Sequence, residues 1–175
     1  MTFKKITIAN QKGGVGKTSV AVNLSHSLAY QNKKVLLVDL DPQGNSTKYY
    51  GINAKKNTVT KVFKDINVKP QPTYLKNVDI LPANKSLSSI IKYMNEINDV
   101  LFKLKEYLCR YYIYDYIIID TPPTLMSLTL SAMIAADSIL IPVSTNYLSL
   151  QGTNDIIESY KKIKLKLNKR LDLLG

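Results

Sequence analysis

The sequence predicts an α/β fold in which a mostly parallel sheet is covered by helices on both faces. Three observations support this fold class. Short apolar runs alternate with segments of helical periodicity, each run is bounded by turn-forming or charged residues, and the N-terminal part reads strand, glycine-rich loop, helix, strand. A chain of 175 residues that is 45% hydrophobic suits one compact domain, so we expect a single domain over residues 1–175.

The apolar runs and the helical spacings place the elements along the chain. Val22 and Ala29 lie seven residues apart and Leu24 and Leu28 lie four apart, and this helical spacing predicts a helix after the glycine-rich loop. We expect strands at residues 6–9, 35–40, 77–81, 116–120 and 138–143, and helical segments at 18–30, 86–112, 125–136 and 149–167. The irregular stretch 53–73 predicts surface loops with a short helix near 58–64, and the final residues RLDLLG predict the start of a further strand.

Charge and cysteine content limit the function classes. The 24 basic and 13 acidic residues give a formal charge of +11, which suits a phosphate-rich partner such as nucleic acid. An AT-rich genome, which enriches Lys, Asn, Ile and Tyr, is the alternative explanation. A lone Cys109 excludes an internal disulfide and a multi-cysteine metal site, and no apolar stretch approaches the ~18 residues of a membrane span. We therefore expect a cytoplasmic protein.

The stretch NQKGGVGKTS at residues 10–19 predicts a phosphate-binding loop. In G-x-x-x-x-G-K-[ST], backbone N–H groups point at phosphate oxygens, the lysine reaches the outer phosphates and the hydroxyl binds magnesium. The strict pattern begins with a glycine that is missing here, but the loop lies between a strand and a helix, as the chemistry requires. A glycine-rich turn without a ligand would not need Lys-Thr at the helix start. The predicted nucleotide-binding residues are Gly13, Gly14, Val15, Gly16, Lys17, Thr18 and Ser19.

Two acids lie at the end of the second predicted strand, in VDLDPQGN. Ligands of open parallel sheets lie beyond the carboxyl ends of the strands, so Asp39 and Asp41 are expected to face the same crevice as the glycine-rich loop. Asp41 lies past the strand end, where a water molecule can be oriented, which favours a catalytic role. For Asp39, a magnesium role and a structural role in the turn before Pro42 and Gly44 both stay open.

A third segment, YDYIIIDTPP, ends an apolar strand with an acid. Such an acid accompanies the phosphate loop in nucleotide hydrolases, where it holds magnesium directly or through water, so Asp120 is the predicted metal residue beside Thr18. Pro122 and Pro123 are expected to stiffen the loop near the γ-phosphate. In the later ILIPVSTNYLSLQG segment, the polar residues Ser144, Thr145 and Asn146 either line the pocket or cap the next helix.

These residues give the chain a specific resemblance. KGGVGKTS, VLLVDLDPQGN and DTPPTLMSLTLSAMIAADSILIPVSTNYLSLQG resemble the ParA family of DNA-partitioning ATPases, within the ParA/MinD class of deviant Walker A P-loop NTPases. The similarity covers nearly the whole chain and is weakest from about 50 to 110. The resemblance implies a hydrolytic role for Asp41, a phosphate-binding role for Lys17, and magnesium binding by Thr18 and Asp120. It also implies that Lys12 crosses to the nucleotide of a partner subunit.

The same resemblance implies cofactors, partners and a place in the cell. ATP and Mg²⁺ bind, an ATP-dependent homodimer forms on non-specific DNA, and hydrolysis, weak alone, is stimulated by DNA and a ParB-like centromere-binding protein. The family partitions plasmids or chromosomes, so we expect a cytoplasmic, nucleoid-associated protein without membrane attachment. A lysine beside glycine at the loop tip has little of its own subunit to pack against, which supports the outward reach of Lys12. A merely solvated loop lysine is the alternative.

Two departures from the family pattern accompany the match. Ser19 replaces the usual second threonine but keeps a hydroxyl. Family members continue past RLDLLG with segments that contact adenine and DNA, so we expect the domain to be incomplete at its C-terminus. No N-terminal helix-turn-helix domain is expected, because the glycine-rich loop begins ten residues from the start.

Rival functions are separated by particular residues. A MinD-like division-site ATPase would need a membrane-binding tail, and the basic stretch 159–170 instead predicts a covering helix with solvated lysines. A nitrogenase-type reductase is excluded by the single cysteine, and a bacterial tyrosine kinase is disfavoured by twelve scattered tyrosines. A truncated remnant that dimerises or binds DNA without catalysis stays open. The densest positive run, a candidate DNA surface, comprises Lys161, Lys162, Lys164, Lys166, Lys169 and Arg170.

Overall fold

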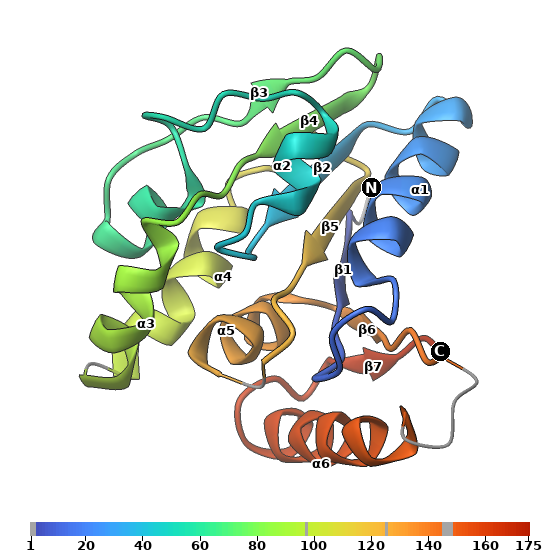
Figure 1. Cartoon of the computed structure of the whole chain (residues 1–175), viewed down its shortest axis with the longest axis vertical. Coiled ribbons are helices and arrows are strands. Elements are labelled where there is room, and N and C mark those ends of the chain that lie inside the picture. The colour runs from blue at the N-terminus through green and yellow to red at the C-terminus, as the bar shows by residue number, and fades with distance from the viewer. Residues whose placement is uncertain (1–2, 97, 125, 145–148) are drawn as a thin grey trace.

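The computed structural model describes residues 3–175 except 97, 125 and 145–148. Its strands form one sheet in the order β3-β4-β2-β5-β1-β6-β7 (Figure 1). All neighbouring strands are parallel except β3 and β4, which are antiparallel. The predicted fold class is therefore confirmed. The strands are β1 Lys4–Ile8, β2 Val35–Asp39, β3 Gln71–Pro72, β4 Val78–Leu81, β5 Tyr116–Asp120, β6 Ser138–Leu140 and β7 Asp172–Leu173.

The helices agree with the predicted segments except in two regions. They are α1 Lys17–Tyr30, α2 Asn45–Tyr49, the 3₁₀ helix η1 Val59–Lys64, α3 Leu87–Glu96, the 3₁₀ helix η2 Asn98–Phe102, α4 Lys103–Leu108, α5 Ser127–Ala135 and α6 Ser149–Lys166. Neither α2 nor the edge strand β3 was predicted. The segment 86–112 is divided into α3, η2 and α4, because buried residues of all three pack into one core cluster. Figure 1 shows α3 and α4 as separate helices on one side of the sheet.

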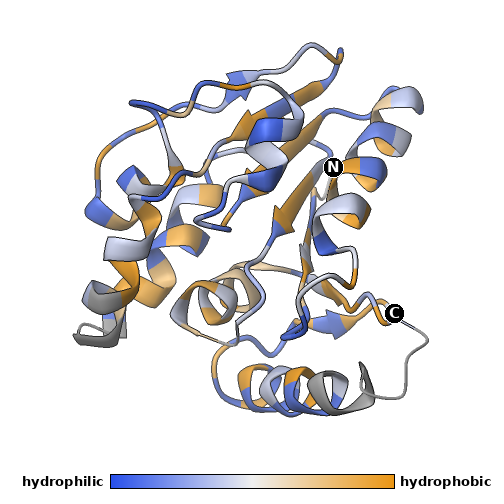
Figure 2. Ribbon diagram, viewed as in Figure 1, coloured by the Kyte–Doolittle hydropathy of each residue, from blue (hydrophilic) through white to orange (hydrophobic). Residues whose placement is uncertain are grey.

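Alternating side chains of β2 explain why helices cover both faces. Leu36 and Val38 point into the core cluster beneath α3, α4 and α5, whereas Val35 and Leu37 join the cluster beneath α1. All four are fully buried, as expected for a central parallel strand. Figure 2 shows that hydrophobic residues (orange) predominate in the central strands. A third cluster joins α5 and β6 to α6, through residues such as Ile134, Ile139 and Ile156.

The sheet register brings three strand ends together. In the parallel pairing, Ile8 at the end of β1 and Asp39 at the end of β2 both lie opposite Asp120, the last residue of β5. The segments that follow these strands are the glycine-rich loop, the Asp41 loop and the Thr121–Pro123 loop. All three predicted site segments therefore leave the sheet at the same edge.

Candidate nucleotide site

The glycine-rich loop has the backbone shape of a phosphate cradle. Gly14 and Gly16 have φ angles of 74° and 87°, a left-handed conformation that favours glycine. Gly16 is also the N-cap of α1, and no side chain there satisfies the N–H groups of the first turn. These donors and the positive end of the helix dipole form an anion site at the predicted position.

A buried asparagine fixes the start of this loop. The Asn10 side chain is 1% exposed. Its Nδ2 donates to the Pro142 carbonyl at 2.8 Å, and its Oδ1 accepts from the Lys12 backbone N–H at 3.0 Å. Asn10 thus ties the loop to the segment after β6. No role was predicted for Asn10, although an amide directly after an apolar strand is a signal that could have suggested one.

Lys17 is a buried cation at the base of the loop. Its side chain is 7% exposed, and its Nζ donates to the Lys12 carbonyl at 2.9 Å. Burial lowers the pKa of Lys17, and the negative charges of Asp120 and Asp41 oppose that shift. Lys12 is half-buried at the start of the loop, and its backbone carbonyl is therefore a hydrogen-bond acceptor for the phosphate-loop lysine.

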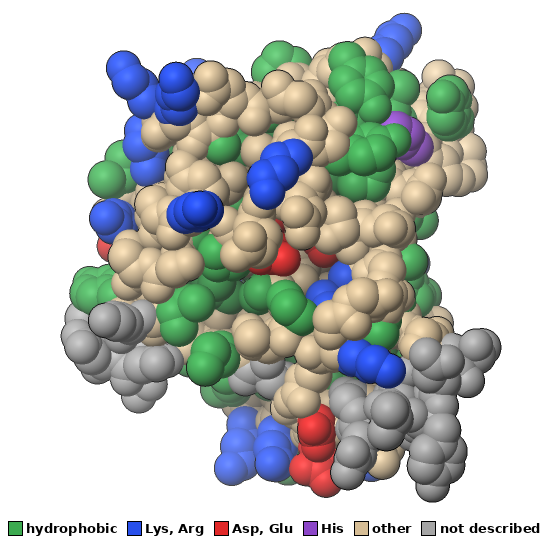
Figure 3. Space-filling view, in the orientation of Figure 1, with side chains coloured by type: hydrophobic (Ala, Val, Ile, Leu, Met, Phe, Trp, Pro, Cys, Tyr) green, Lys and Arg blue, Asp and Glu red, His purple; other side chains and the backbone are tan. Residues whose placement is uncertain are grey.

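A pocket of about 310 Å³ opens above the loop. Figure 3 shows acidic and basic side chains meeting in the hollow at the centre of this face. The lining residues are Gly13, Gly14, Gly16, Lys17, Thr18, Ser19, Asp41, Asn45, Thr121 and Pro123. Most of the predicted loop residues line it, together with the predicted hydrolytic acid. Val15, a further predicted residue, is half-buried beside them.

One carboxylate oxygen of Asp120 has a hydrogen-bond partner and the other has none among the described residues. Its Oδ2 accepts from the Ser46 hydroxyl at 2.7 Å, whereas its buried Oδ1 has no hydrogen-bond partner among the described residues. Burial raises the pKa of Asp120 to about 6, and hydrogen bonds from Ser46 and Thr18 oppose that rise. Thr18 and Asp120, the predicted magnesium pair, therefore lie together. An open carboxylate oxygen beside a hydroxyl is a donor set that suits Mg²⁺.

Asp39 differs from Asp120, because both of its carboxylate oxygens are satisfied. Oδ1 accepts from the Asp41 N–H at 3.0 Å, and Oδ2 accepts from the Thr47 N–H and hydroxyl at 2.9 and 2.7 Å. Burial and then the charge of Asp120 raise the pKa of Asp39 to about 7, against these hydrogen bonds. Its contacts are those expected of the structural alternative. The magnesium role of Asp39 stays a prediction.

Asp41 lies beyond the strand end and faces the pocket. It is 7% exposed, and its Oδ1 accepts from the Gln43 N–H at 2.9 Å, which fixes the orientation of the carboxylate. In another loop that lines the pocket, the Thr121 hydroxyl donates to the Ile8 carbonyl at 2.7 Å and joins the ends of β5 and β1. The pocket is thus lined by a fixed carboxylate and by a fixed loop.

The short helix α2 links the pocket to both strand-end acids. Asn45 lines the pocket, Ser46 binds Asp120 and Thr47 binds Asp39. The Thr47 hydroxyl also accepts from the Ala83 N–H at 3.0 Å. The contact between Ser46 and Asp120 was not predicted, because these two residues lie 74 positions apart in the sequence.

Other predicted residues have separate outcomes. Ser144 is half-buried after β6, whereas Thr145 and Asn146 lie outside the described residues, so their two alternative roles stay predictions.

In α6, Ile156 and Ile163 are buried, which confirms a covering helix. Lys164 binds Asp172 at 2.7 Å, whereas Lys161, Lys162, Lys166, Lys169 and Arg170 are exposed. No helix among the described residues is both long enough and apolar enough to cross a membrane.

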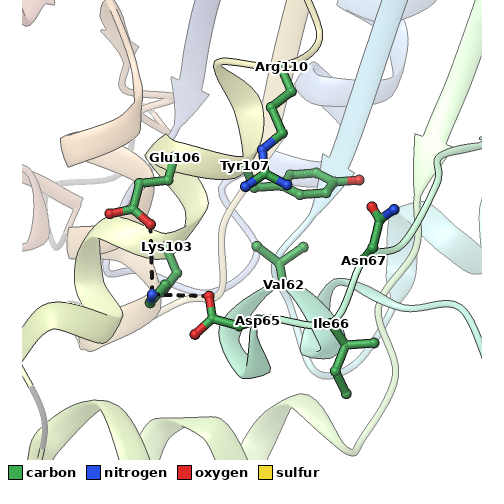
Figure 4. A pocket seen from close by; sticks show the side chains of 8 residues that line it. All are labelled: Val62, Asp65, Ile66, Asn67, Lys103, Glu106, Tyr107 and Arg110. Carbon is green, nitrogen blue, oxygen red and sulfur yellow. Dashed lines mark ion pairs between the residues drawn. The ribbon is translucent and has the colours of Figure 1, made fainter.

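A smaller pocket of about 80 Å³ lies between η1 and α4 (Figure 4). Lys103 bridges two of its acids, with Nζ 3.0 Å from Asp65 and 3.8 Å from Glu106. The hydroxyl of Tyr107 donates to the Val68 carbonyl at 2.7 Å. The lysine and the two acids pair with each other and the tyrosine hydroxyl bonds a backbone carbonyl, so the geometry favours the larger pocket as the ligand site.

The chain matches known protein families over almost its whole length. A family model described as an AAA domain matches residues 3–173. The chain is 39% identical over 180 residues to the sporulation initiation inhibitor protein Soj of Bacillus subtilis, covering 98% of this chain and 70% of that protein. It is 41% identical over 177 residues to the chromosome partitioning protein ParA of Myxococcus xanthus, covering 97% and 62%.

Solved structures show the same architecture. The cobyrinic acid a,c-diamide synthase of Mycobacterium smegmatis with bound ATP analog and magnesium is 30% identical, with a TM-score of 0.94 over 99% of this chain and 73% of that one. A putative plasmid partition protein of Borrelia burgdorferi bound to AMPPNP is 32% identical, with a TM-score of 0.85 over 99% and 75%. Across the matches described, this chain spans between 62% and 75% of each relative.

Proposed function

Since the chain belongs to the ParA family of partitioning ATPases, we propose that it binds ATP with Mg²⁺ and hydrolyses the nucleotide during plasmid or chromosome segregation. The observation that carries this proposal is one pocket lined by the buried Lys17, the fixed Asp41 and Thr18. Beneath the pocket, Asp120 is buried beside Thr18 with one unpartnered carboxylate oxygen. This combination supplies phosphate binding, a water-orienting group and a cation ligand at the same edge of the sheet.

The residues present fit both ATP and magnesium. The N–H groups of Gly13 to Thr18 and the Lys17 ammonium would bind the phosphates. The Thr18 hydroxyl and the open oxygen of Asp120 would hold Mg²⁺ directly or through water. Bound Mg-ATP supplies the transferable phosphoryl group and a cation that neutralises its developing charge. A buried, unpartnered carboxylate oxygen is costly unless such a ligand completes it.

Two residues are assigned to the transfer itself. Asp41 orients the attacking water, because its carboxylate faces the pocket in an orientation fixed by the Gln43 N–H. Lys12 contributes positive charge across the interface of an ATP-dependent homodimer, as an arginine finger does in other phosphoryl-transfer enzymes. We assign Lys12 this role because its backbone is fixed from both sides, by Asn10 and by Lys17.

Calorimetric titration of Mg-ATP and phosphate release test this proposal. Lys17→Ala should abolish binding, whereas Asp41→Ala should retain binding and lose turnover by roughly 100-fold or more. Lys33→Ala, at an exposed lysine just beyond α1, is the matched control and should behave as wild type. Binding without turnover by the wild-type protein, even with DNA, would support the non-catalytic remnant instead.

We further propose that the dimer binds non-specific DNA through the exposed lysines near the end of α6 and that a ParB-like protein stimulates hydrolysis. The supporting observation is that Lys161, Lys162 and Lys166 are exposed on a helix anchored by buried isoleucines. Replacing these three lysines by glutamine should flatten the salt dependence of DNA binding. Lys55→Gln/Lys56→Gln, in an exposed loop, is the control. An unchanged salt slope in the α6 variant would move the DNA surface elsewhere.

A further inference from the structure

Five aromatic residues that are scattered in the sequence gather into one surface cluster, which we call the tyrosine patch. The ring centroids of Tyr49, the last residue of α2, and Tyr50, which follows it, lie 5.3 Å apart, and those of Tyr49 and Tyr50 lie 5.7 and 5.6 Å from that of His26 in α1. Tyr74, between β3 and β4, lies 5.6 Å from Tyr50. Tyr30 lies four residues after His26 in α1, so it is on the same face of the helix as His26.

The tyrosine patch exposes an unusual amount of aromatic surface. Tyr30 is 77% exposed, Tyr49 is 53% exposed and Tyr74 is 68% exposed, whereas Tyr50 beneath them is 4% exposed. Figure 3 shows the only histidine (purple) beside a group of hydrophobic side chains (green) on the face that contains the nucleotide pocket. Exposed tyrosines grouped in this way are typical of protein interaction sites.

The charge around the patch has one sign. The contributing segments 26–33, 45–52 and 71–77 contain three lysines and no acidic residue. These lysines, Lys33, Lys48 and Lys76, are all exposed. The next acid along the chain, Asp79, accepts a hydrogen bond from the Tyr114 hydroxyl at 2.7 Å. A partner that fits this surface therefore carries negative charge.

We propose that the tyrosine patch is a docking site for an acidic protein segment that also carries aromatic or apolar side chains. The ring geometry favours protein over single-stranded nucleic acid. Tyr49 meets Tyr50 at 79° and His26 at 65°, so these rings pack edge to face against each other. Stacking of successive bases requires open, flat ring faces, whereas tyrosine edges and hydroxyls suit the mixed contacts of a protein interface.

Helix α2 connects this surface to the nucleotide site. The same five-residue helix carries Ser46, which binds Asp120, and Tyr49, which belongs to the patch. A partner that shifts α2 would therefore also shift the acid proposed to hold magnesium. This consequence rests on the proposed function, whereas docking itself does not.

The docking site is tested by measuring how a labelled random copolymer of glutamate and tyrosine binds to the full chain. No nucleotide is added. Polyglutamate of the same length measures the contribution of charge alone. The Tyr30→Ala/Tyr49→Ala/Tyr74→Ala variant should weaken copolymer binding by roughly tenfold or more. Tyr112→Ala is the matched control, because Tyr112 is 76% exposed outside the patch, and it should bind as wild type does.

Two results would overturn the inference. Equal copolymer binding by wild type and the triple variant would show that charge alone holds the polymer. Tyrosine-dependent binding of oligo(dT) that is tighter than copolymer binding would make the patch a nucleic-acid surface. If the triple variant loses its cooperative thermal unfolding, Lys33→Glu/Lys48→Glu/Lys76→Glu replaces it, with the same expected loss. Because no ATP is present, a failed docking site is distinguishable from a failed ATPase.

Discussion

Helix α2 separates two regions that each contain buried polar atoms without a partner among the described residues. Beneath the nucleotide pocket the unpartnered atom is Oδ1 of Asp120, and in the tyrosine patch the atoms are Nε2 of His26 and the Tyr50 hydroxyl. The oxygen of Asp120 is accompanied by a cavity of about 310 Å³ that is lined by a buried lysine. The atoms beneath the patch are covered by aromatic rings. An unpartnered atom therefore indicates a small-ligand site only where a cavity and complementary charge accompany it.

The sharpest test of the pocket side of this comparison is Asp120→Asn. If the unpartnered oxygen of Asp120 holds magnesium, the ATP affinity of the variant measured with Mg²⁺ should be roughly 10- to 100-fold weaker than that of wild type. The ATP affinity measured in excess chelator should be the same for both proteins. Titration calorimetry with and without Mg²⁺ measures both quantities. Asp65→Asn, at an exposed acid paired with Lys103, is the control. Wild-type magnesium dependence in Asp120→Asn would remove this carboxylate from the metal site.

The chain around α2 shows what the sequence does and does not predict. The glycine-rich loop and the acids after β2 and β5 were predicted, because local patterns mark strand ends and phosphate loops. The connection from Ser46 to Asp120 was not, since it joins positions that only the sheet register brings together. The tyrosine patch was missed for the same reason. Its members come from α1, α2 and the residue after it, and the β3–β4 connection, so residues that are far apart in the sequence lie together in the fold.

Gly44 tests how strongly the two regions depend on the placement of α2. It precedes α2 with φ 63°, and a Cβ there would lie 3.0 Å from the Ala83 carbonyl oxygen. Gly44→Ala should therefore lower the free energy of unfolding by about 2 kcal/mol, from left-handed strain plus this contact. Urea denaturation measures the loss.

Gly51→Ala is the matched control for that measurement. Gly51 has a similar φ of 65°, but a Cβ there would meet nothing within 4 Å. Only the conformational strain applies, so we expect a loss of about 1 kcal/mol. Equal losses in the two variants would show that contact with Ala83 does not constrain the start of α2.

Ser46→Ala tests whether the hydrogen bond that orients Asp120 matters separately from the carboxylate of Asp120. The variant removes the 2.7 Å hydrogen bond to Asp120 and keeps the carboxylate. We expect Mg-ATP affinity to fall by about tenfold, because groups that orient a metal ligand have effects of this order. Ser89→Ala, whose hydroxyl donates only to the Ser86 carbonyl in a local turn, is the control. Unchanged affinity in Ser46→Ala would mean that α2 does not position the metal site.

The divided segment 86–112 and the edge strand β3 show a second limit of the sequence. A helical pattern persists through residues 86–112, but the segment is divided into α3, η2 and α4, and Met94, Val100 and Leu104 from these three elements all reach the same buried cluster. In β3, Pro72 weakens any strand pattern, and the pairing is possible because proline is tolerated at a sheet edge. Tertiary packing therefore decided both regions.

The smallest expected effect is the pH dependence of stability that arises from His26 in the tyrosine patch. Burial lowers the pKa of His26 below 6.5, so between the lowered value and 6.5 the unfolded chain binds more protons than the folded one. The contribution of His26 to stability is therefore complete above pH 6.5 and is lost as the pH falls through that window. Asp39 and Asp120, with raised pKa values, act in the opposite direction, because stability decreases as rising pH ionises them.

Comparing His26→Gln with wild type isolates the histidine, since the acids contribute equally to both proteins. The difference in melting temperature between the two proteins, measured without Mg²⁺ from pH 5 to pH 8, should move in favour of the variant as the pH falls. Ser27→Ala, at an exposed position of the same helix, should follow the wild-type profile. A pH-independent difference for His26→Gln would show that protonation of His26 costs the folded state nothing. The patch would then tolerate a positive charge beneath its rings, and an acidic partner would gain a further cation to bind.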